Sequence, residues 1–201
     1  MKLAPAAVIL AAGESRRMGS PKPLLRIGGE TFVDRLIGVF APHCDPIVVV
    51  LGHHAEAVRG GTRRAGEVTF VVNPDPARGM LSSLRCAFEC LPPEFPAVIF
   101  TPVDHPLILP ETVRLLVEAW DRHPEMPVLV PTYGEQPEQR RGHPVLVSRF
   151  LVPEFLTLPP DGQPGDVIRA HRSSTLYVPV ADPGILCDID TPADYQQAMG
   201  R

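Results

Sequence analysis

The sequence has no apolar run that approaches the ~20 residues needed by a membrane-spanning helix. It also lacks an excess of basic residues, because 19 Lys and Arg stand against 23 Asp and Glu, a net charge of −4. That balance argues against duplex nucleic acid as a partner, although a local basic loop can still bind a small anion. We therefore expect a cytoplasmic protein that contacts neither membrane nor nucleic acid.

Several common site motifs are missing as well. The four cysteines include no Cys-x-x-Cys pair, so small buried thiols in a reducing cytosol are favoured over a disulfide or zinc framework. No Gly-x-Gly-x-x-Gly segment is present, which makes a flavin or NAD oxidoreductase remote, and no P-loop motif follows the early glycines. His53, His54 and His143 lack the mutual spacing of zinc ligands.

What is present is an ordinary globular composition, with 44% hydrophobic and 21% charged residues in 201 positions. The chain shows no internal repeat and no linker, so we expect one domain over residues 1–201. Its start, MKLAPAAVILAAG, faintly resembles a signal peptide. A single basic residue and a proline at the head of the run favour a first buried strand instead.

Apolar, β-branched segments alternate with helical patterns along the chain. Most of the apolar segments are continuous, which suits strands covered on both faces. The expected strands are residues 6–11, 46–52, 68–73, 97–104, 127–131, 144–148, 176–180 and 185–190. The expected helices are residues 31–40, 53–60, 79–91, 110–120 and the segment after Thr191. This order predicts an α/β three-layer sandwich, with a mostly parallel sheet and helices on both faces.

Two expected helices begin with capping residues, and two further segments have the composition of loops. Thr31 with Asp34 is close to a capping box, and Thr191 with Asp194 forms one around a first-turn proline. Residues 131–143 and 157–166 are polar and rich in turn formers, so we expect loops there.

The loop after the first strand, in the segment VILAAGESRRMGSPKPLL, has the ingredients of a phosphate cradle. Gly13 allows a tight turn that exposes backbone N–H groups, and Ser15 adds a hydroxyl. Arg16, Arg17 and Lys22 add three positive charges within seven positions. Because ligands of parallel sheets bind beyond the carboxyl ends of the strands, this is a favoured place for an anion. A solvated basic loop is the alternative.

Acidic residues follow two later strands. Asp104 ends the expected strand 97–104 and should share the sheet edge with Gly13, where a carboxylate could bind Mg²⁺ on a triphosphate. Capping of the helix near Pro110 is the alternative, at a distance of six residues. Asp188 and Asp190 follow the last expected strand, and we expect one helix cap and one metal ligand, with Asp190 the better cap beside Thr191.

These segments resemble the molybdenum cofactor nucleotidyltransferases, the MobA-like NTP transferases. LAAGESRRMGSPKPLL (10–25) matches the family signature LAAGxSxRMGxxKxLL in spacing. The resemblance continues in order through NPDPARGMLSSL (73–84), TPVDHP (101–106), RGHPVLVS (141–148) and DIDTPADY (188–195). It implies a Rossmann-like fold of the nucleotide-diphospho-sugar-transferase kind. It also implies Mg²⁺-dependent transfer of a nucleoside monophosphate from an NTP onto a phosphate-bearing acceptor.

The resemblance implies roles for individual residues. Arg17 and Lys22 neutralise the triphosphate and, with Asp104, carry the catalytic step; Asp104 binds Mg²⁺ with Asp188 or Asp190 as its second carboxylate. The turn formed by Gly142, His143 and Pro144 lies on the acceptor side. The other implied nucleotide-binding residues are Leu10, Ala11, Ala12, Gly13, Ser15, Ser82 and Ser83.

The LAAG form of the signature favours the relatives that use CTP and act on molybdopterin, and a molybdoenzyme or its chaperone is an implied partner. Related cytidylyltransferases carry GD-x-G-x-R near the acceptor, whereas residues 165–170 here read GDVIRA. That departure puts the pterin acceptor in doubt and leaves nucleotidyl transfer intact. A guanylyltransferase, a sugar-phosphate nucleotidyltransferase and a non-catalytic nucleotide-binding cofactor chaperone are the alternatives. A phosphate nucleophile needs no general base, so we expect His105 to be structural.

Overall fold

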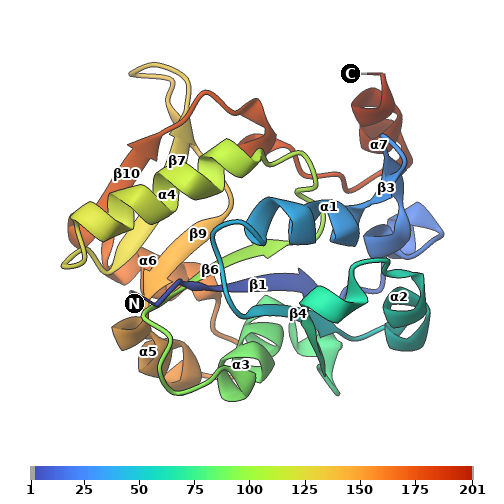
Figure 1. Cartoon of the computed structure of the whole chain (residues 1–201), viewed down its shortest axis with the longest axis horizontal. Coiled ribbons are helices and arrows are strands. Elements are labelled where there is room, and N and C mark those ends of the chain that lie inside the picture. Colours follow the sequence, from blue (N-terminus) through green and yellow to red (C-terminus); the bar gives the residue numbers. More distant parts are fainter. Residues whose placement is uncertain (1–2, 201) are drawn as a thin grey trace.

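The computed structural model describes residues 3–200, and a twisted sheet runs through the middle of it (Figure 1). The order of its main strands is β10-β7-β9-β6-β1-β4-β5, with β8 attached to β7. The strands are β1 (Ala6–Ala11), β4 (Ile47–Leu51), β5 (Thr69–Val72), β6 (Ala97–Pro102), β7 (Val128–Tyr133), β8 (Arg140–Arg141), β9 (Val145–Ser148) and β10 (Thr175–Pro179). Two short strands, β2 (Arg26–Ile27) and β3 (Glu30–Thr31), pair separately.

The sheet is mostly parallel, as the sequence predicted. β1 pairs in parallel with β4 and β6, β4 with β5, and β10 with β7. The exceptions are β8, which is antiparallel to β7, and β9, which runs antiparallel to both of its neighbours, β6 and β7. Its reversal follows from the short β7–β8–β9 excursion, because antiparallel strands can be joined by short turns whereas parallel strands need a crossover.

Helices cover both faces of the sheet. They are α1 (Phe32–Phe40), α2 (Ala55–Gly61), α3 (Met80–Cys90), α4 (Pro110–Arg122), α5 (Val152–Thr157), α6 (Pro164–Ala170) and α7 (Pro192–Met199). α1 and α4 lie on one face, and α3 and α5 lie on the other (Figure 1). Among residues 3–200, every helix is too short or too polar to cross a bilayer.

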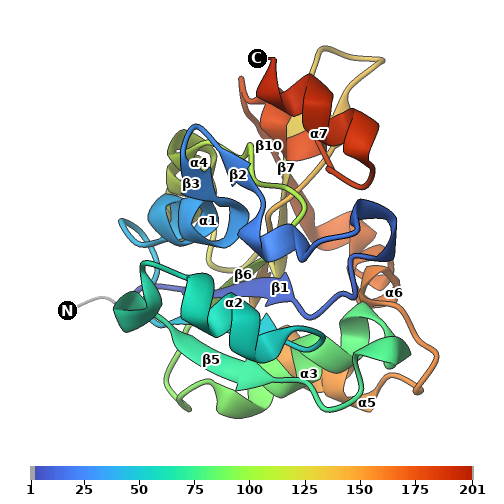
Figure 2. The ribbon, with the colours of Figure 1, turned by 90° about the vertical axis from the view of Figure 1, so that its right-hand side faces the viewer.

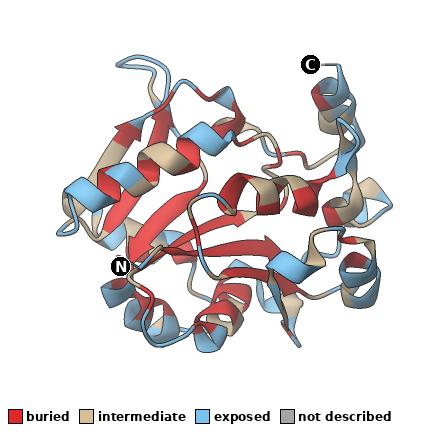
Figure 3. Cartoon of the chain, viewed as in Figure 1, coloured by how far each residue is buried: buried red, intermediate tan, exposed pale blue. Residues whose placement is uncertain are grey.

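β1 divides the core into two apolar layers, and the strands beside it are buried from both sides (Figure 3). Ile9 and its alternate neighbours face the layer that includes Leu36 of α1, while Val8 and its alternates face the layer that includes Leu84 of α3. Side chains of a strand point alternately to opposite faces, so a continuous apolar run is what a doubly covered strand requires.

Three expectations about chain segments are corrected by the structure. Residues 185–190 form no strand: a short 3-10 helix at Pro183–Leu186 precedes an extended stretch outside the sheet. α6 begins at Pro164, inside the turn-rich segment 157–166, where the Gln163 backbone N–H donates to Asp166 Oδ2 at 2.8 Å. The expected loop 131–143 contains the end of β7 and all of β8, and α5 was not expected. Proline in the first turn is compatible with a helix, so proline-rich composition concealed both starts.

The chain changes direction across the sheet at β1. It leaves β1 over one face through α1 to reach β4, and it reaches β6 over the other face through α3. The loops that follow β1 and β6 lie beyond neighbouring strand ends, at the carboxyl edge of the sheet where ligands of parallel sheets bind. Figure 2, turned by 90°, brings this edge toward the viewer.

Candidate functional site

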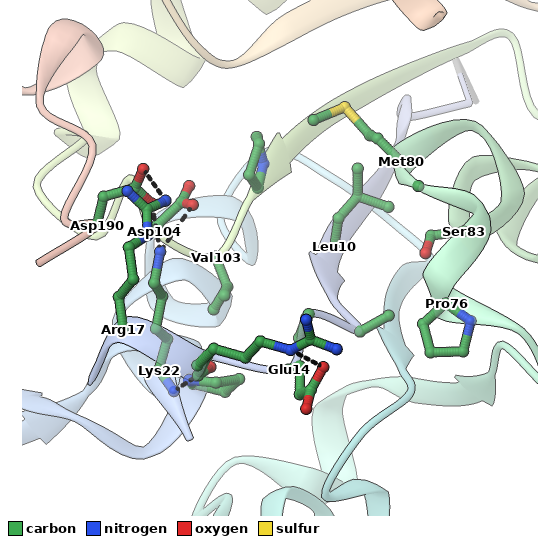
Figure 4. Close-up of a pocket in the computed structure, with 18 residues that line it drawn as sticks. Leu10, Glu14, Arg17, Lys22, Pro76, Met80, Ser83, Val103, Asp104 and Asp190 are labelled. Atoms are coloured by element: carbon green, nitrogen blue, oxygen red, sulfur yellow. Dashed lines mark hydrogen bonds and ion pairs between the residues drawn. The ribbon is translucent and has the colours of Figure 1, made fainter. Parts of the chain in front are cut away.

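A cavity of about 410 Å³ opens at that edge (Figure 4). It is built by the loop after β1, the residue pair after β6, the start of α3 and the segment before α7. The lining includes ten of the residues predicted from the sequence: Leu10, Ala11, Ala12, Gly13, Ser15, Arg17, Lys22, Ser83, Asp104 and Asp190.

One end of the cavity is charged. The Lys22 Nζ atom lies 2.5 Å from Asp190 Oδ1 and 3.4 Å from Asp104 Oδ2. Arg17 Nη2 donates to Asp190 Oδ2 at 2.7 Å. These residues are up to 173 positions apart in the sequence, and they come together because their elements meet at one sheet edge. Lys22 is largely enclosed, with 13% of its side chain exposed, whereas Arg17 is 66% exposed and free to adjust.

The loop that carries the two cations is held in shape by backbone conformation. Ser15 and Gly19 both have positive φ, at 59° and 66°, so the chain turns sharply on either side of Arg17. The Ser15 hydroxyl accepts a hydrogen bond from the Lys22 backbone N–H at 2.9 Å. Left-handed conformation at a non-glycine residue is uncommon and costs energy, so the closing hydrogen bond helps to maintain it.

The two carboxylates are electrostatically different. Burial raises the pKa of Asp104, and the Lys22 charge only partly opposes that effect. The hydrogen bond from Lys22 lowers the pKa of Asp190, with Arg17 adding to the effect. Two cations balance two carboxylates here, so the bare site offers a polyanion little net attraction. A divalent cation on the carboxylates would leave the site positive.

The donor set fits a metal that arrives with phosphate. Among residues 3–200, no group of three or more His, Cys, Asp or Glu side chains could hold a metal by itself. Two carboxylates, Asp104 and Asp190, face the same end of the cavity. Mg²⁺ is commonly bound through one or two carboxylates together with substrate phosphates, so these oxygens suit it and a closed protein cage is not needed.

The opposite end of the cavity is apolar, with a single hydroxyl. Leu10, Pro76 and Met80 line it, and Ser83 lies beside them, across the cavity from Asp190 (Figure 4). Asn73, directly after β5, donates hydrogen bonds from Nδ2 to the Oγ atoms of Ser82 and Ser83 at 2.8 and 3.0 Å. A pocket with one charged end and one apolar end matches the polarity of a nucleotide's phosphates and base.

Two half-buried histidines lie close to Asp104. The rings of His105 and His143 are 4.7 Å apart, and His105 Nε2 is 3.9 Å from Asp104 Oδ1. Burial lowers the pKa of each imidazole to about 4, so both are neutral at pH 7. Neither lines the cavity. His105 thus lies beside Asp104 and outside the cavity lining, and its structural role stays a prediction.

Five of the predicted site residues lie outside the cavity lining: Ser82, Gly142, His143, Pro144 and Asp188. The Ser82 hydroxyl donates to Gly79 O at 2.8 Å, within its own helical turn. Gly142 and His143 form the turn between β8 and β9, where the His143 backbone N–H donates to Ile185 O at 3.0 Å. The exposed Asp188 borders a separate recess with Leu107 and Gln197.

The expectation that Asp190 caps the helix after Thr191 is wrong. Asp190, expected to cap α7, directs its carboxylate to Arg17 and Lys22 instead. The α7 cap is a reciprocal pair of Thr191 and Asp194, as the sequence predicted. The capping role is filled without either earlier aspartate, which frees Asp190 for the cavity.

Asn73, Pro76 and Met80 were not predicted as site residues. Each belongs to NPDPARGM, a segment that follows strand β5 at the same edge as Gly13 and Asp104. The rule that ligands lie beyond the carboxyl ends of strands applies to Asn73 as well. Its uncharged side chain gave no sign of that role.

One family model and two curated relatives match most of the chain. The family model of the MobA-like NTP transferase domain matches residues 7–175. The chain is 28% identical to the molybdenum cofactor cytidylyltransferase of Escherichia coli K12 over 196 residues, 96% of this chain and 95% of that protein. It is 29% identical to a probable molybdenum cofactor guanylyltransferase of Rhodopirellula baltica over 191 residues, 93% of this chain and 88% of that one.

The fold has solved counterparts. Rv0371c from Mycobacterium tuberculosis H37Rv superposes with a TM-score of 0.82 at 26% identity, covering 98% of this chain and 99% of that chain. A structure of Rv0371c in complex with manganese gives a TM-score of 0.75 at 25% identity, with both chains covered completely. A divalent cation has thus been seen with a protein of this fold.

Proposed function

The chain belongs to the family of MobA-like NTP transferases, and from that membership we propose its reaction in detail. As a nucleotidyltransferase, it moves a nucleoside monophosphate, CMP in first place, from an NTP onto a phosphate-bearing acceptor and releases pyrophosphate. The molybdopterin cofactor is the first candidate acceptor. The observation that carries this proposal is the convergence of Lys22, Asp104 and Asp190 at one end of a cavity whose other end is apolar.

The chain's own side chains align the substrate and neutralise its charge. Lys22 and Arg17 bind the triphosphate, and as cations they stabilise the negative charge that builds on the departing pyrophosphate. Asp104 and Asp190 would hold Mg²⁺, which when bound supplies further neutralisation of the phosphates. The backbone of Leu10–Gly13 borders the nucleotide between the two ends of the cavity.

No residue needs to act as a general base. An acceptor phosphate is already ionised at neutral pH, and its oxygen attacks the α-phosphorus directly as the bond to pyrophosphate breaks. His105 and His143, neutral and outside the cavity lining, support the carboxylate wall of the cavity. The turn at Gly142–Pro144, next to this wall, is the proposed acceptor side.

The base and the acceptor are supported by different observations. CTP is favoured by the LAAG sequence at residues 10–13 and by the near full-length similarity to the E. coli cytidylyltransferase. GTP is the second candidate, because a probable guanylyltransferase is similar over 93% of the chain. The segment 165–170 departs from the cytidylyltransferase pattern, so the acceptor is the part of the proposal that most needs a direct test.

The test is a pair of assays on the purified protein. Thermal shift with each of the four NTPs and Mg²⁺ should show the largest rise in melting temperature with CTP, because a ligand that binds only the native state stabilises it. Pyrophosphate release is then measured with molybdopterin cofactor and with a sugar 1-phosphate as acceptors. Release with the sugar phosphate alone would overturn the pterin assignment. NTP binding without release with any acceptor would favour the nucleotide-binding chaperone.

A further inference from the structure

We propose that Asn73 is a positioning residue for nucleotide recognition: it fixes the Ser83 hydroxyl as a hydrogen-bond donor directed at the base end of the cavity. This inference rests on the proposed function, since it assigns a task at the same site. Asn73 would act on recognition of the nucleoside, whereas the charged residues at the other end of the cavity would bind the phosphates.

The orientation of the Asn73 amide is set by a neighbour that can only donate. The backbone N–H of Asp75 donates to Asn73 Oδ1 at 2.9 Å. With its oxygen committed to that N–H, the amide must present its NH₂ group on the other side, where it reaches Ser82 and Ser83. Asn73 is 3% exposed, and its backbone N–H donates a hydrogen bond to Leu51 O. The backbone from which the side chain extends is therefore held in place.

The same logic sets the roles of the two serines. A hydroxyl has one proton and two lone pairs, and both Oγ atoms accept from Asn73. Ser82 then uses its proton on the carbonyl of Gly79 at 2.8 Å. Ser83, 4% exposed and lining the cavity, has no acceptor for its proton among residues 3–200. A nearly buried donor without a partner is costly, and a ligand acceptor would satisfy it.

The chemistry of the expected partner follows from the surroundings. Ser83 lies with Pro76 and Met80, away from Lys22 and the carboxylates (Figure 4). An apolar wall suits the flat face of a nucleobase, and a single donor suits a ring carbonyl oxygen or an unprotonated ring nitrogen. Cytosine offers both acceptors on one edge.

The experiment is a double-mutant cycle read by calorimetry with two probes, CTP with Mg²⁺ and inorganic tripolyphosphate with Mg²⁺. Ser83→Ala should weaken CTP binding about three- to tenfold, the range for one neutral hydrogen bond, and leave tripolyphosphate binding unchanged. Asn73→Ala should weaken CTP binding by a similar factor in the wild-type background. It should have no effect in the Ser83→Ala background, because the residue acts through that hydroxyl. Ser148→Ala removes another serine that is 4% exposed, outside the cavity, and is the matched control.

Three results would overturn the inference. One is CTP affinity unchanged in Ser83→Ala; another is loss of both probes together in Ser83→Ala; the third is an Asn73→Ala effect of the same size with and without Ser83. If Asn73→Ala does not fold, Asn73→Asp retains the acceptor for Asp75 and removes both donors. The change in tripolyphosphate affinity then measures the effect of the added charge. The inference requires that Asn73→Asp weakens CTP binding by more than this change. Wild-type protein that binds neither probe would refute the proposed function itself, whereas a wild type that binds CTP normally confines any failure to the role of Asn73.

Discussion

Lys22 and Asp190 are 168 positions apart in sequence, yet the Lys22 Nζ atom lies 2.5 Å from Asp190 Oδ1. Asp104 Oδ2 lies 3.4 Å from the same nitrogen. A compact ammonium between two carboxylates occupies a place suited to a cation, so Lys22 must share the carboxylates with any metal that enters. Under the proposed function, the lysine would then turn to the phosphates that accompany the metal. Predictions for these three residues follow from that exchange.

Asp104→Asn should lower Mg²⁺-dependent kcat/KM about 100-fold or more, because it removes a metal-binding oxygen charge at the reacting end of the cavity. The fold should persist, since the side chain is partly exposed and an amide has the same shape. Pyrophosphate release measures the rate, and circular dichroism checks the fold. Asp161→Asn, on an exposed turn, is the control. A rate within twofold of wild type would contradict the metal assignment.

Asp190→Asn should reduce activity far more than Asp188→Asn, because only Asp190 lines the cavity and contacts Lys22 and Arg17. The apparent affinity for Mg²⁺, obtained from a titration of the rate at fixed NTP, should weaken at least tenfold in the first variant. We expect a change below threefold in the second. The reverse order would return the second metal ligand to Asp188.

Lys22→Ala should weaken binding of the triphosphate and not of the nucleoside. Charge-assisted hydrogen bonds contribute about 1.5–3 kcal/mol, so a loss of about 10- to 100-fold in CTP affinity is expected. Calorimetry with CTP and with cytidine separates the two parts of the ligand. Arg63→Ala, an exposed cation outside the cavity, should change neither affinity. Equal losses for both ligands would show that Lys22 shapes the cavity as a whole.

The sequence predicted most of the sheet because the physical signal was local. A continuous apolar run such as residues 6–11 suits a strand buried on both faces, and its place beside β4 and β6 follows from the crossovers. The last expected strand was wrong for the same reason. Ile185 and Ile189 are apolar because they are buried, yet they pack against the core from outside the sheet. Apolar composition reports burial, and hydrogen-bond pairing is decided elsewhere in the chain.

The site residues that the sequence predicted also differ in kind from those that it missed. Charged residues that follow strands, such as Lys22 and Asp104, were found because charge at a strand end has few structural uses. Asn73 was missed because an uncharged amide is common in turns, and its importance lies in the direction of its hydrogen bonds. The choice between Asp188 and Asp190 depended on how Thr191 and Asp194 share the capping of α7, a contact that sequence spacing shows only in part.

Gly142→Ala should destabilise the fold, because a Cβ there would lie 2.2 Å from Ile185 O, a backbone atom that cannot simply rotate away. Overpacking of this kind costs about 1–3 kcal/mol, and a domain of this size loses about 2–4 °C in melting temperature for each kcal/mol. Gly60→Ala, in α2 with nothing within 4 Å of its Cβ, should be neutral or stabilising. A melting temperature for Gly142→Ala equal to wild type would mean that the β8–β9 turn is displaced easily from Ile185.

The half-buried histidines should make the protein sensitive to mild acid. Burial lowers the pKa of His105 and of His143 from 6.5 to about 4, so between these values the unfolded chain binds protons that the folded chain does not. The contribution of each histidine to the free energy of unfolding is therefore fully present above pH 6.5. It falls as the pH drops toward 4, by about 3 kcal/mol for one such histidine. Urea unfolding across that range measures the slope. His143→Gln removes one titrating group and should flatten the slope, whereas His123→Gln, at the surface end of α4, should leave it unchanged. An unchanged slope in His143→Gln would show that the imidazole gains its proton as readily in the folded protein as in the unfolded chain.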